Sequence, residues 1–273
     1  MFHQLSDMLN RFGYLNDFKD ALNEYIKKAG ITFELGMHCS FNRKELPLYG
    51  NYYQTLKKDL ELAAKFGAKS IVAHPPHCAR NVNDELIELL ISDDILNLVK
   101  EHKIILAWEN MPYDNFYGSL KALVEFRQGL VERLKEIGQE EAAKYHQFCL
   151  DTGHLLTWRA YPPKASKSAY KEIEGYLPIF AKNIKVFHIH ANDGMDDRHI
   201  VPFSFEFFDL VSRRNLDKER FIQNSEDIMK WLRICEENKG VEGRHLHLEA
   251  LMLPFSIRQF TEFAKRIYEL KKP

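Results

Sequence analysis

The hydrophobic pattern of the chain alternates between short, mostly apolar runs and longer segments in which apolar residues recur at helical spacing. The short runs are typical of buried strands. Six are predicted, at residues 31–38, 68–77, 103–112, 147–154, 184–193 and 244–251. The longer segments are typical of amphipathic helices. These helices are predicted at residues 17–28, 54–66, 84–102, 118–144, 167–181, 226–238 and 256–271.

Strands that alternate with helices predict a parallel sheet, and this many units in 273 residues favour a TIM (β/α)8-type barrel over an open sheet. The α/β barrel is expected to be a single domain over residues 1–273, because no low-complexity tract or change of composition marks a linker. A closed barrel of this type has eight strands. We therefore expect the barrel to be incomplete at its N-terminus, unless one strand is hidden there in a segment with helical periodicity.

The composition of the chain indicates its compartment and the kinds of partner that it could bind. The formal net charge of -1 gives no overall field that would attract nucleic acid or an anionic membrane, so any contact with a polyanion must be local. The four cysteines, Cys39, Cys78, Cys149 and Cys235, form no CxxC pair, which favours a reducing compartment. The N-terminus lacks the pattern of a signal peptide, and no stretch approaches the ~18 apolar residues of a membrane span. A cytoplasmic protein is expected.

Every predicted strand ends on a side chain that can bind a metal ion. These residues are His38, His74, Glu109, Asp151 with His154, His190 and Glu249. The segment HIHANDGMDDRHI, residues 188–200, adds Asp197 and His199 in the loop after His190. Because the carboxyl ends of barrel strands meet at one face, where barrel enzymes carry their chemistry, we expect these side chains to converge there.

Each residue alone has a simpler interpretation. A single strand-end histidine such as His38 or His74 is more often structural than a ligand. Asp151 could cap the helix that follows it. Glu109 differs, because a carboxylate inside the apolar run LAWEN is costly to bury without a cation or hydrogen-bond donors. The convergence of six strands on such side chains outweighs the simpler interpretations. Nitrogen and oxygen donors without sulfur suit zinc, manganese or iron(II).

Six further polar residues are left out of the expected site. Three histidines one or two inward positions below the rim are expected to fill the barrel interior: His188, His245 and His247. Three residues are expected to be solvated or to lie behind the ligands: His77, Asp193 and Asp196.

From residue 17 to the C-terminus, this ordered set resembles the xylose-isomerase-like barrels. That group includes endonuclease IV, the metal-dependent apurinic/apyrimidinic endonuclease, together with many sugar isomerases and epimerases. The resemblance to endonuclease IV implies three metal ions, zinc first and manganese second. It implies that His38, His74 and Glu109 hold one ion and that Glu109 bridges to a second, held also by Asp151, His190 and Glu249. His154, Asp197 and His199 would hold the third.

The resemblance implies two chemistries. A single-metal isomerase or epimerase of sugars or sugar phosphates would use only Glu109, Asp151, His190 and Glu249, with the two glutamates as catalytic residues that move a proton. Phosphoester hydrolysis with clustered metals uses the remaining ligands as well, and is therefore the first hypothesis. There Glu109 and Glu249 would position the metals and the attacking water. The third alternative is a barrel without catalysis that serves as a binding module.

The substrate is expected to be phosphorylated, either abasic DNA or a small sugar phosphate, and an oligomer is compatible with the sequence. Two departures from endonuclease IV bear on this choice. The glycine-rich turn after the DRH motif is replaced by IVPFSFEFFDL, and the region before residue 17 lacks the early strands and the arginine-bearing loop. Basic and aromatic loop residues could still contact a nucleotide or a sugar phosphate. They are Phe41, Arg43, Lys44, Arg80, Trp158, Arg159, Tyr161 and Arg198.

Overall fold

The structure of the protein is a computed structural model. It describes Asp20, Glu24 and residues 36–39, 51–78, 80–113, 115–157, 163–194, 197, 199–204, 218–241, 243–248 and 257–270. The predicted helix at 17–28 lies outside these residues apart from Asp20 and Glu24, which are helical. Glu249 and all the basic and aromatic loop residues named above except Arg80 also lie outside them.

The described strands form one parallel sheet in chain order. They are β1 (Gly36–His38), β2 (Ser70–Ala73), β3 (Ile105–Glu109), β4 (His146–Asp151), β5 (Ile184–Ile189) and β6 (His245–Leu248). The sheet curls so far that a Cβ placed on Gly36 of β1 would lie 3.7 Å from Cε1 of His247 on β6. The predicted α/β fold is confirmed as a curled half-barrel of six parallel strands. Each strand lies within a segment predicted to be a strand, except that β4 begins one residue earlier, at His146.

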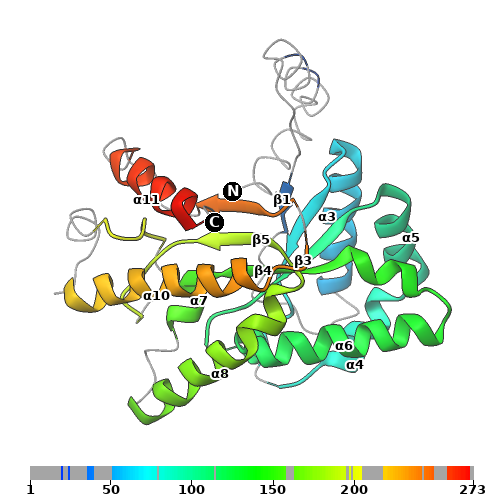
Figure 1. Cartoon of the computed structure of the whole chain (residues 1–273). Helices are drawn as coiled ribbons and strands as arrows, with labels where there is room; N and C mark the ends of the chain where they lie inside the picture. The colour runs from blue at the N-terminus through cyan, green and yellow to red at the C-terminus, as the bar shows by residue number, and fades with distance from the viewer. Residues whose placement is uncertain are drawn as a thin grey trace.

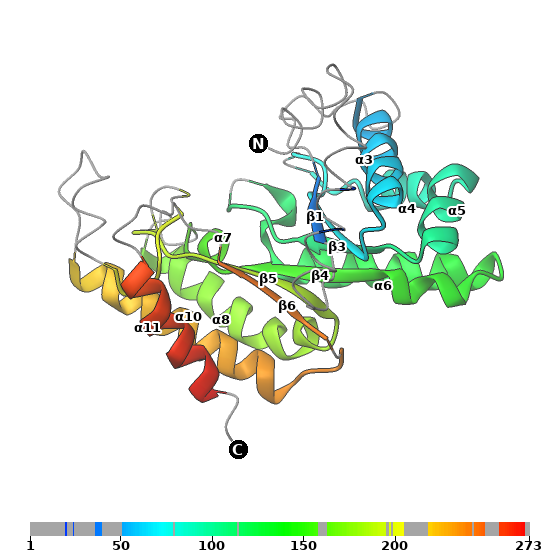
Figure 2. The same cartoon turned by 90° about the horizontal axis from the view of Figure 1, so that it is seen from above.

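Helices surround the outside of this curled sheet, with α6, α8 and α10 along its central strands (Figures 1 and 2). The α-helices are α3 (Tyr53–Phe66), α4 (Asn83–Leu90), α5 (Asp93–His102), α6 (Leu120–Glu136), α7 (Thr152–Leu156), α8 (Pro163–Ala181), α10 (Lys218–Glu237) and α11 (Ile257–Leu270). The 3-10 helices within the described residues are η2 (Phe116–Gly118) and η3 (Glu140–Tyr145). None of the helices in the described part of the chain is long and apolar enough to cross a membrane.

Two predicted helices are each divided in the structure. The segment 84–102 forms α4 and α5, because Ser92 is extended between them and its hydroxyl donates to the carbonyl of Leu89 at 2.7 Å. Asp93 and Asp94 then favour a new helix start beside the positive end of the helix dipole. The segment 118–144 forms α6 and η3, separated at Gly138, whose φ of 68° is left-handed.

The two faces of the sheet carry different residues because successive side chains alternate. Outward residues such as Leu106, Trp108 and Phe148 pack against the helices in the main hydrophobic core. The inward residues include a small apolar cluster, made by Val72, Ala107, Cys149 and Val186. Farther toward the carboxyl ends of the strands, the inward positions become imidazoles and carboxylates. The curled sheet therefore has an apolar floor and a polar rim.

Candidate metal centre

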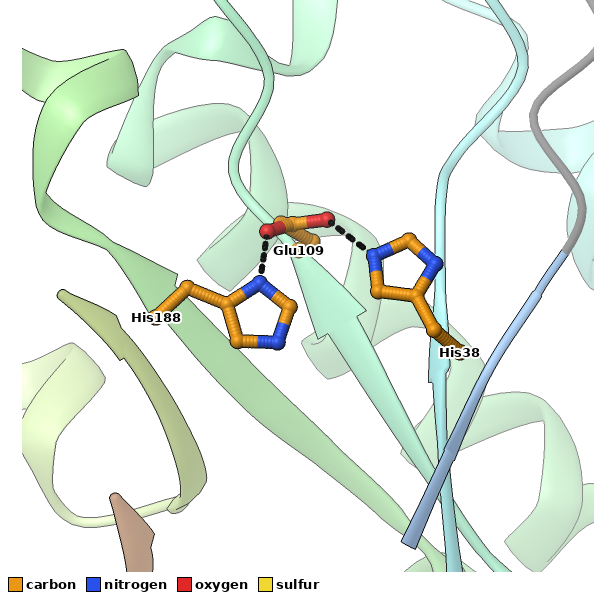
Figure 3. A group of neighbouring side chains, drawn as sticks. All are labelled: His38, Glu109 and His188. Atoms are coloured by element: carbon orange, nitrogen blue, oxygen red, sulfur yellow. Dashed lines mark hydrogen bonds and ion pairs between the residues drawn. The ribbon is translucent and has the colours of Figure 1, made fainter. Parts of the chain in front are cut away.

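Glu109, the last residue of β3, is the centre of the first cluster on the rim. Its carboxylate is almost fully buried, with 1% exposure. Oε2 lies 2.7 Å from Nε2 of His74 and 3.6 Å from Nε2 of His38. Oε1 lies 2.7 Å from Nδ1 of His188 on β5. Figure 3 shows this carboxylate between the rings of His38 and His188. Three strands and the residue after a fourth thus deliver side chains to one point.

The two oxygens of Glu109 differ in their surroundings. Oε1 accepts the hydrogen bond from His188. Oε2 is buried and no hydrogen bond of acceptable geometry reaches it, although the imidazole of His74 is close. Burial would raise the pKa of Glu109, but the facing imidazole of His188, followed by those of His38 and His74, holds that pKa well below its usual range. A buried ionised oxygen that no hydrogen bond of acceptable geometry reaches is an arrangement that a cation fits.

Asp151 and His190 form the second cluster, together with His154. Nε2 of His190 lies 3.0 Å from Oδ1 and 3.1 Å from Oδ2 of Asp151. Oδ1 of Asp151 also accepts a hydrogen bond of 2.7 Å from the backbone N–H of His154, and so caps α7. Asp151 therefore caps the helix and lies in the polar cluster at once. Ligand atoms of the three residues lie within 4.8 Å of one another, as do those of His38, Glu109 and His188.

The loop after β5 adds a third group. Oδ2 of Asp197 lies 3.1 Å from Nε2 of His154 and 3.8 Å from Nε2 of His199. The rings of His190 and His199 are stacked, with centroids 4.0 Å apart. Burial would raise the pKa of Asp197, but its contacts with His154 and His199 lower that pKa strongly. His190 belongs to both the second and third groups.

Asn110 and Gly153 shape the second cluster, and neither was identified from the sequence. The side chain of Asn110 donates to the carbonyl of Asp151 at 2.9 Å and accepts from its N–H at 2.8 Å. The carbonyl of Asn110 lies 2.6 Å from Nδ1 of His154. That contact directs the other ring nitrogen of His154 toward Asp197. A Cβ on Gly153 would overlap the imidazole of His190, so glycine gives that ring its space.

The structure brings together all eight predicted ligands that it describes. They are His38, His74, Glu109, Asp151, His154, His190, Asp197 and His199. Their role as ligands remains a prediction, as does that of Glu249, which lies outside the described residues.

Some residues that the sequence placed outside the site have other positions. His188 does line the interior, as expected, but it also contacts Glu109. Its inward spacing from His190 was a signal that could have placed it in the site. Asp193 is only 5% exposed, which excludes the expected alternative that its side chain is solvated. Arg80 is exposed and lies 3.4 Å from a carboxylate oxygen of Glu85. His77 is half-buried.

Comparisons with known proteins agree with this architecture. A family model described as a xylose isomerase-like TIM barrel matches residues 1–237. An uncharacterized protein of Methanocaldococcus jannaschii is 29% identical over 248 residues, which cover 88% of this chain and 84% of that protein.

Solved structures with the same fold include several determined with divalent metals. The IOLI protein with a zinc atom has a TM-score of 0.57 at 15% identity, covering 96% of this chain and 86% of that chain. A Thermus thermophilus protein soaked with ZnCl2 has a TM-score of 0.51 at 18% identity, covering 92% and 84%. A Mycobacterium smegmatis xylose isomerase-like TIM barrel protein in complex with magnesium has 0.53 at 12% identity, covering 92% and 78%. At these identities the similarity shows the fold alone.

Proposed function

The chain belongs to the xylose isomerase-like TIM barrel family, and on this basis we propose that it is a divalent-metal-dependent hydrolase of phosphoesters. The observation that carries the proposal is the size of the connected donor set. Proton transfer beside a sugar carbonyl needs one metal and two carboxylates, a need that Glu109, Asp151 and His190 with Glu249 would meet. Five further donors lie in the same set without a use in that chemistry. They are His38, His74, His154, Asp197 and His199.

The donors suit zinc first and manganese second, because they are imidazole nitrogens and carboxylate oxygens. His38, His74 and Glu109 would hold one ion, through the Glu109 oxygen that no hydrogen bond of acceptable geometry reaches. A second ion would lie among Asp151, His154, His190, Asp197 and His199. Bound divalent ions would supply positive charge that stabilises the phosphoryl oxygens. They would also lower the pKa of a bound water, so that it can act as a nucleophile near neutral pH.

The substrate would approach the cluster from the side of its exposed members. The side chains of His38, Asp197 and His199 are 34%, 33% and 32% exposed. Those of Glu109 and Asp151 are 1% and 0% exposed. The exposed residues would therefore meet the phosphoryl group, while the buried carboxylates hold their geometry away from bulk water. Glu109, together with Glu249, would position the ions and, through them, the attacking water.

The chemistry shared by the two candidate substrates is a phosphate ester on a sugar, either in abasic DNA or in a small sugar phosphate. The net charge of -1 offers no overall attraction for a long polyanion, so a DNA substrate would depend on local loop residues. The single-metal isomerase or epimerase is the second candidate, because its smaller donor set lies within the larger one.

Metal content and activity measured on the same preparation test the proposal. The purified protein is loaded with zinc or manganese, dialysed and subjected to elemental analysis. It is then assayed with an abasic-site duplex and with sugar phosphates. More than one metal equivalent per chain, with hydrolysis that EDTA abolishes and His199→Ala impairs, would support the hydrolase. His102→Ala, at an exposed position at the end of α5, is the matched control. One equivalent, with deuterium uptake into a ketose from D2O and no hydrolysis, would support the isomerase instead.

A further inference from the structure

The two oxygens of Glu109 are used differently by the protein itself. Oε1 lies 2.7 Å from Nδ1 of His188 and 4.0 Å from Sγ of Cys149, and both groups can donate a hydrogen. Oε2 faces His38 and His74 without a hydrogen bond of acceptable geometry. The carboxylate therefore offers one oxygen to a cation, while protein donors already occupy the other.

His188 lies between the two carboxylates of the rim. Its Nδ1 is 3.9 Å from Oδ2 of Asp151 as well as 2.7 Å from Glu109, and β4 and β5 place Asp151 opposite His188 in register. A carboxylate oxygen only accepts hydrogen bonds, so Nδ1 carries the proton in its contact with Glu109. The positive end of that N–H bond therefore faces Oε1 of Glu109, and Asp151 is the other carboxylate near the same nitrogen.

The ring of His188 is held in place by its neighbours. It is stacked against His38, with centroids 5.3 Å apart and planes 16° apart, and against His247, with centroids 5.7 Å apart and planes 22° apart. Its side chain is 3% exposed. The ring would have to leave this stack before an ion could reach Oε1 of Glu109.

We propose that His188 takes the place of the bridging metal ion that the resemblance to endonuclease IV implies, so that the protein holds two ions rather than three. Glu109 is then a terminal ligand through Oε2, in one centre with His38 and His74. The other ion belongs to the group around His190. His188 is a positioning residue, because it fixes which oxygen of Glu109 faces the metal. This inference rests on the metal site of the proposed function, but concerns the number of ions and not the reaction.

Titration of the full-length apoprotein with Co²⁺ tests the inference. Bound metal is counted by elemental analysis after dialysis, and the visible absorption of Co²⁺ reports the ligand environment. Two variants distinguish the effect of the N–H donor of His188 from the effect of its imidazole ring. His188→Asn keeps an N–H group close to the position of Nδ1, whereas His188→Leu removes it at similar volume. We expect two equivalents and similar spectra for the wild type and His188→Asn. We expect His188→Leu to bind one of the ions about 10–100-fold more weakly, because Glu109 loses its orienting partner.

Three equivalents in the wild type would overturn the inference, while leaving the multinuclear hydrolase in place. One equivalent in the wild type would overturn both this inference and the multinuclear hydrolase. Equal affinity of wild type and His188→Leu for every ion would overturn the positioning role of His188. The count on the wild type and His188→Asn decides the matter even if His188→Leu does not fold. Failure to hydrolyse any phosphoester with two ions bound would refute the proposed function and leave this inference standing.

Discussion

The imidazole of His190 lies directly against the backbone of Gly153, on the first turn of α7, so closely that a Cβ on Gly153 would overlap the ring. We therefore expect Gly153→Ala to displace His190 from Asp151 and from the stack with His199. The variant should lose the ion of that group, while the centre at Glu109 keeps its own. Elemental analysis and Co²⁺ absorption of the purified variant would measure this loss.

Gly175 provides the matched control for that glycine. It lies within α8, is exposed, and has nothing within 4 Å of an added Cβ. Gly175→Ala should keep full metal content and stabilise the helix by about 0.5–1 kcal/mol, because alanine loses less backbone entropy than glycine. Retention of both ions by Gly153→Ala would show that the ring of His190 can move without consequence, contrary to our expectation.

Asn110 is expected to support the second cluster through its hydrogen bonds to the backbone of Asp151. Asn110→Ala removes two hydrogen bonds to the backbone of Asp151 and leaves its buried N–H and carbonyl without those partners. The free energy of unfolding should fall by about 1–3 kcal/mol. The affinity for the ion beside Asp151 and His154 should fall about 10–100-fold, because supporting hydrogen bonds orient ligands. Urea denaturation and Co²⁺ titration measure the two effects.

Asn81→Ala is a suitable comparison for the asparagine variant. Asn81 is exposed, and its side chain accepts a hydrogen bond from the N–H of Asn83 at 2.8 Å, outside the cluster. We expect this variant to bind metal as the wild type does. If Asn110→Ala lost stability but bound both ions with wild-type affinity, Asn110 would have only a structural role.

His38 and His199 are expected to serve different ions. His38 contacts Glu109 in the first cluster, whereas His199 stacks on His190 and belongs to the third group. Each single substitution to alanine should remove or weaken one ion, and the double variant should lose both with additive effects, because the two residues share no direct partner. Stepwise Co²⁺ titrations of the three variants give the comparison. Loss of both ions in either single variant would mean that the two groups bind metal as one cooperative unit.

The strands and the site could largely be predicted from the sequence, because both depend on short-range patterns. Apolar runs located every strand that the structure describes, to within one residue at the start of β4. Residues such as Glu109 and Asp151 end strands whose carboxyl ends meet at one edge. The break between α4 and α5 was missed. It depends on the extended backbone of Ser92, which interrupts a helical periodicity that otherwise continues across it.

The site residues that the sequence did not identify depend on contacts that form only in the folded structure. Gly153 matters because it lies against the ring of His190, the residue after β5 and 37 positions later in the chain. Asn110 matters because its side chain reaches the neighbouring strand. His188 contacts Glu109 only because the sheet curls and a stack of imidazoles fixes its ring. Sequence spacing gives the face of a strand on which a residue lies, but not the ring orientation or the hydrogen-bond partner.

His146 gives the protein a stability that depends on pH, far along β4 from the rim. It is 1% exposed, is stacked against Trp108, and accepts a hydrogen bond of 3.4 Å from the indole N–H. Burial, followed by the nearby charge of Arg127, lowers the pKa of His146 to about 3. The folded state therefore keeps the ring neutral, whereas the unfolded chain protonates it near pH 6.5. Between these two values the unfolded state binds more protons, so stability falls as the pH falls.

We expect His146→Gln, which stays neutral and can accept from Trp108, to be less sensitive to acid than the wild type. Between pH 7 and pH 5, neutral burial of His146 accounts for about 2 kcal/mol of the loss in free energy of unfolding. Urea denaturation of both proteins at the two pH values measures the difference, with metal removed so that ligand protonation contributes equally to both. His102→Gln, at an exposed position, should follow the wild type. If the stability of His146→Gln depended on pH as strongly as that of the wild type, the ring of His146 would have to be protonated in the folded wild type. That result would contradict the low pKa that its burial implies.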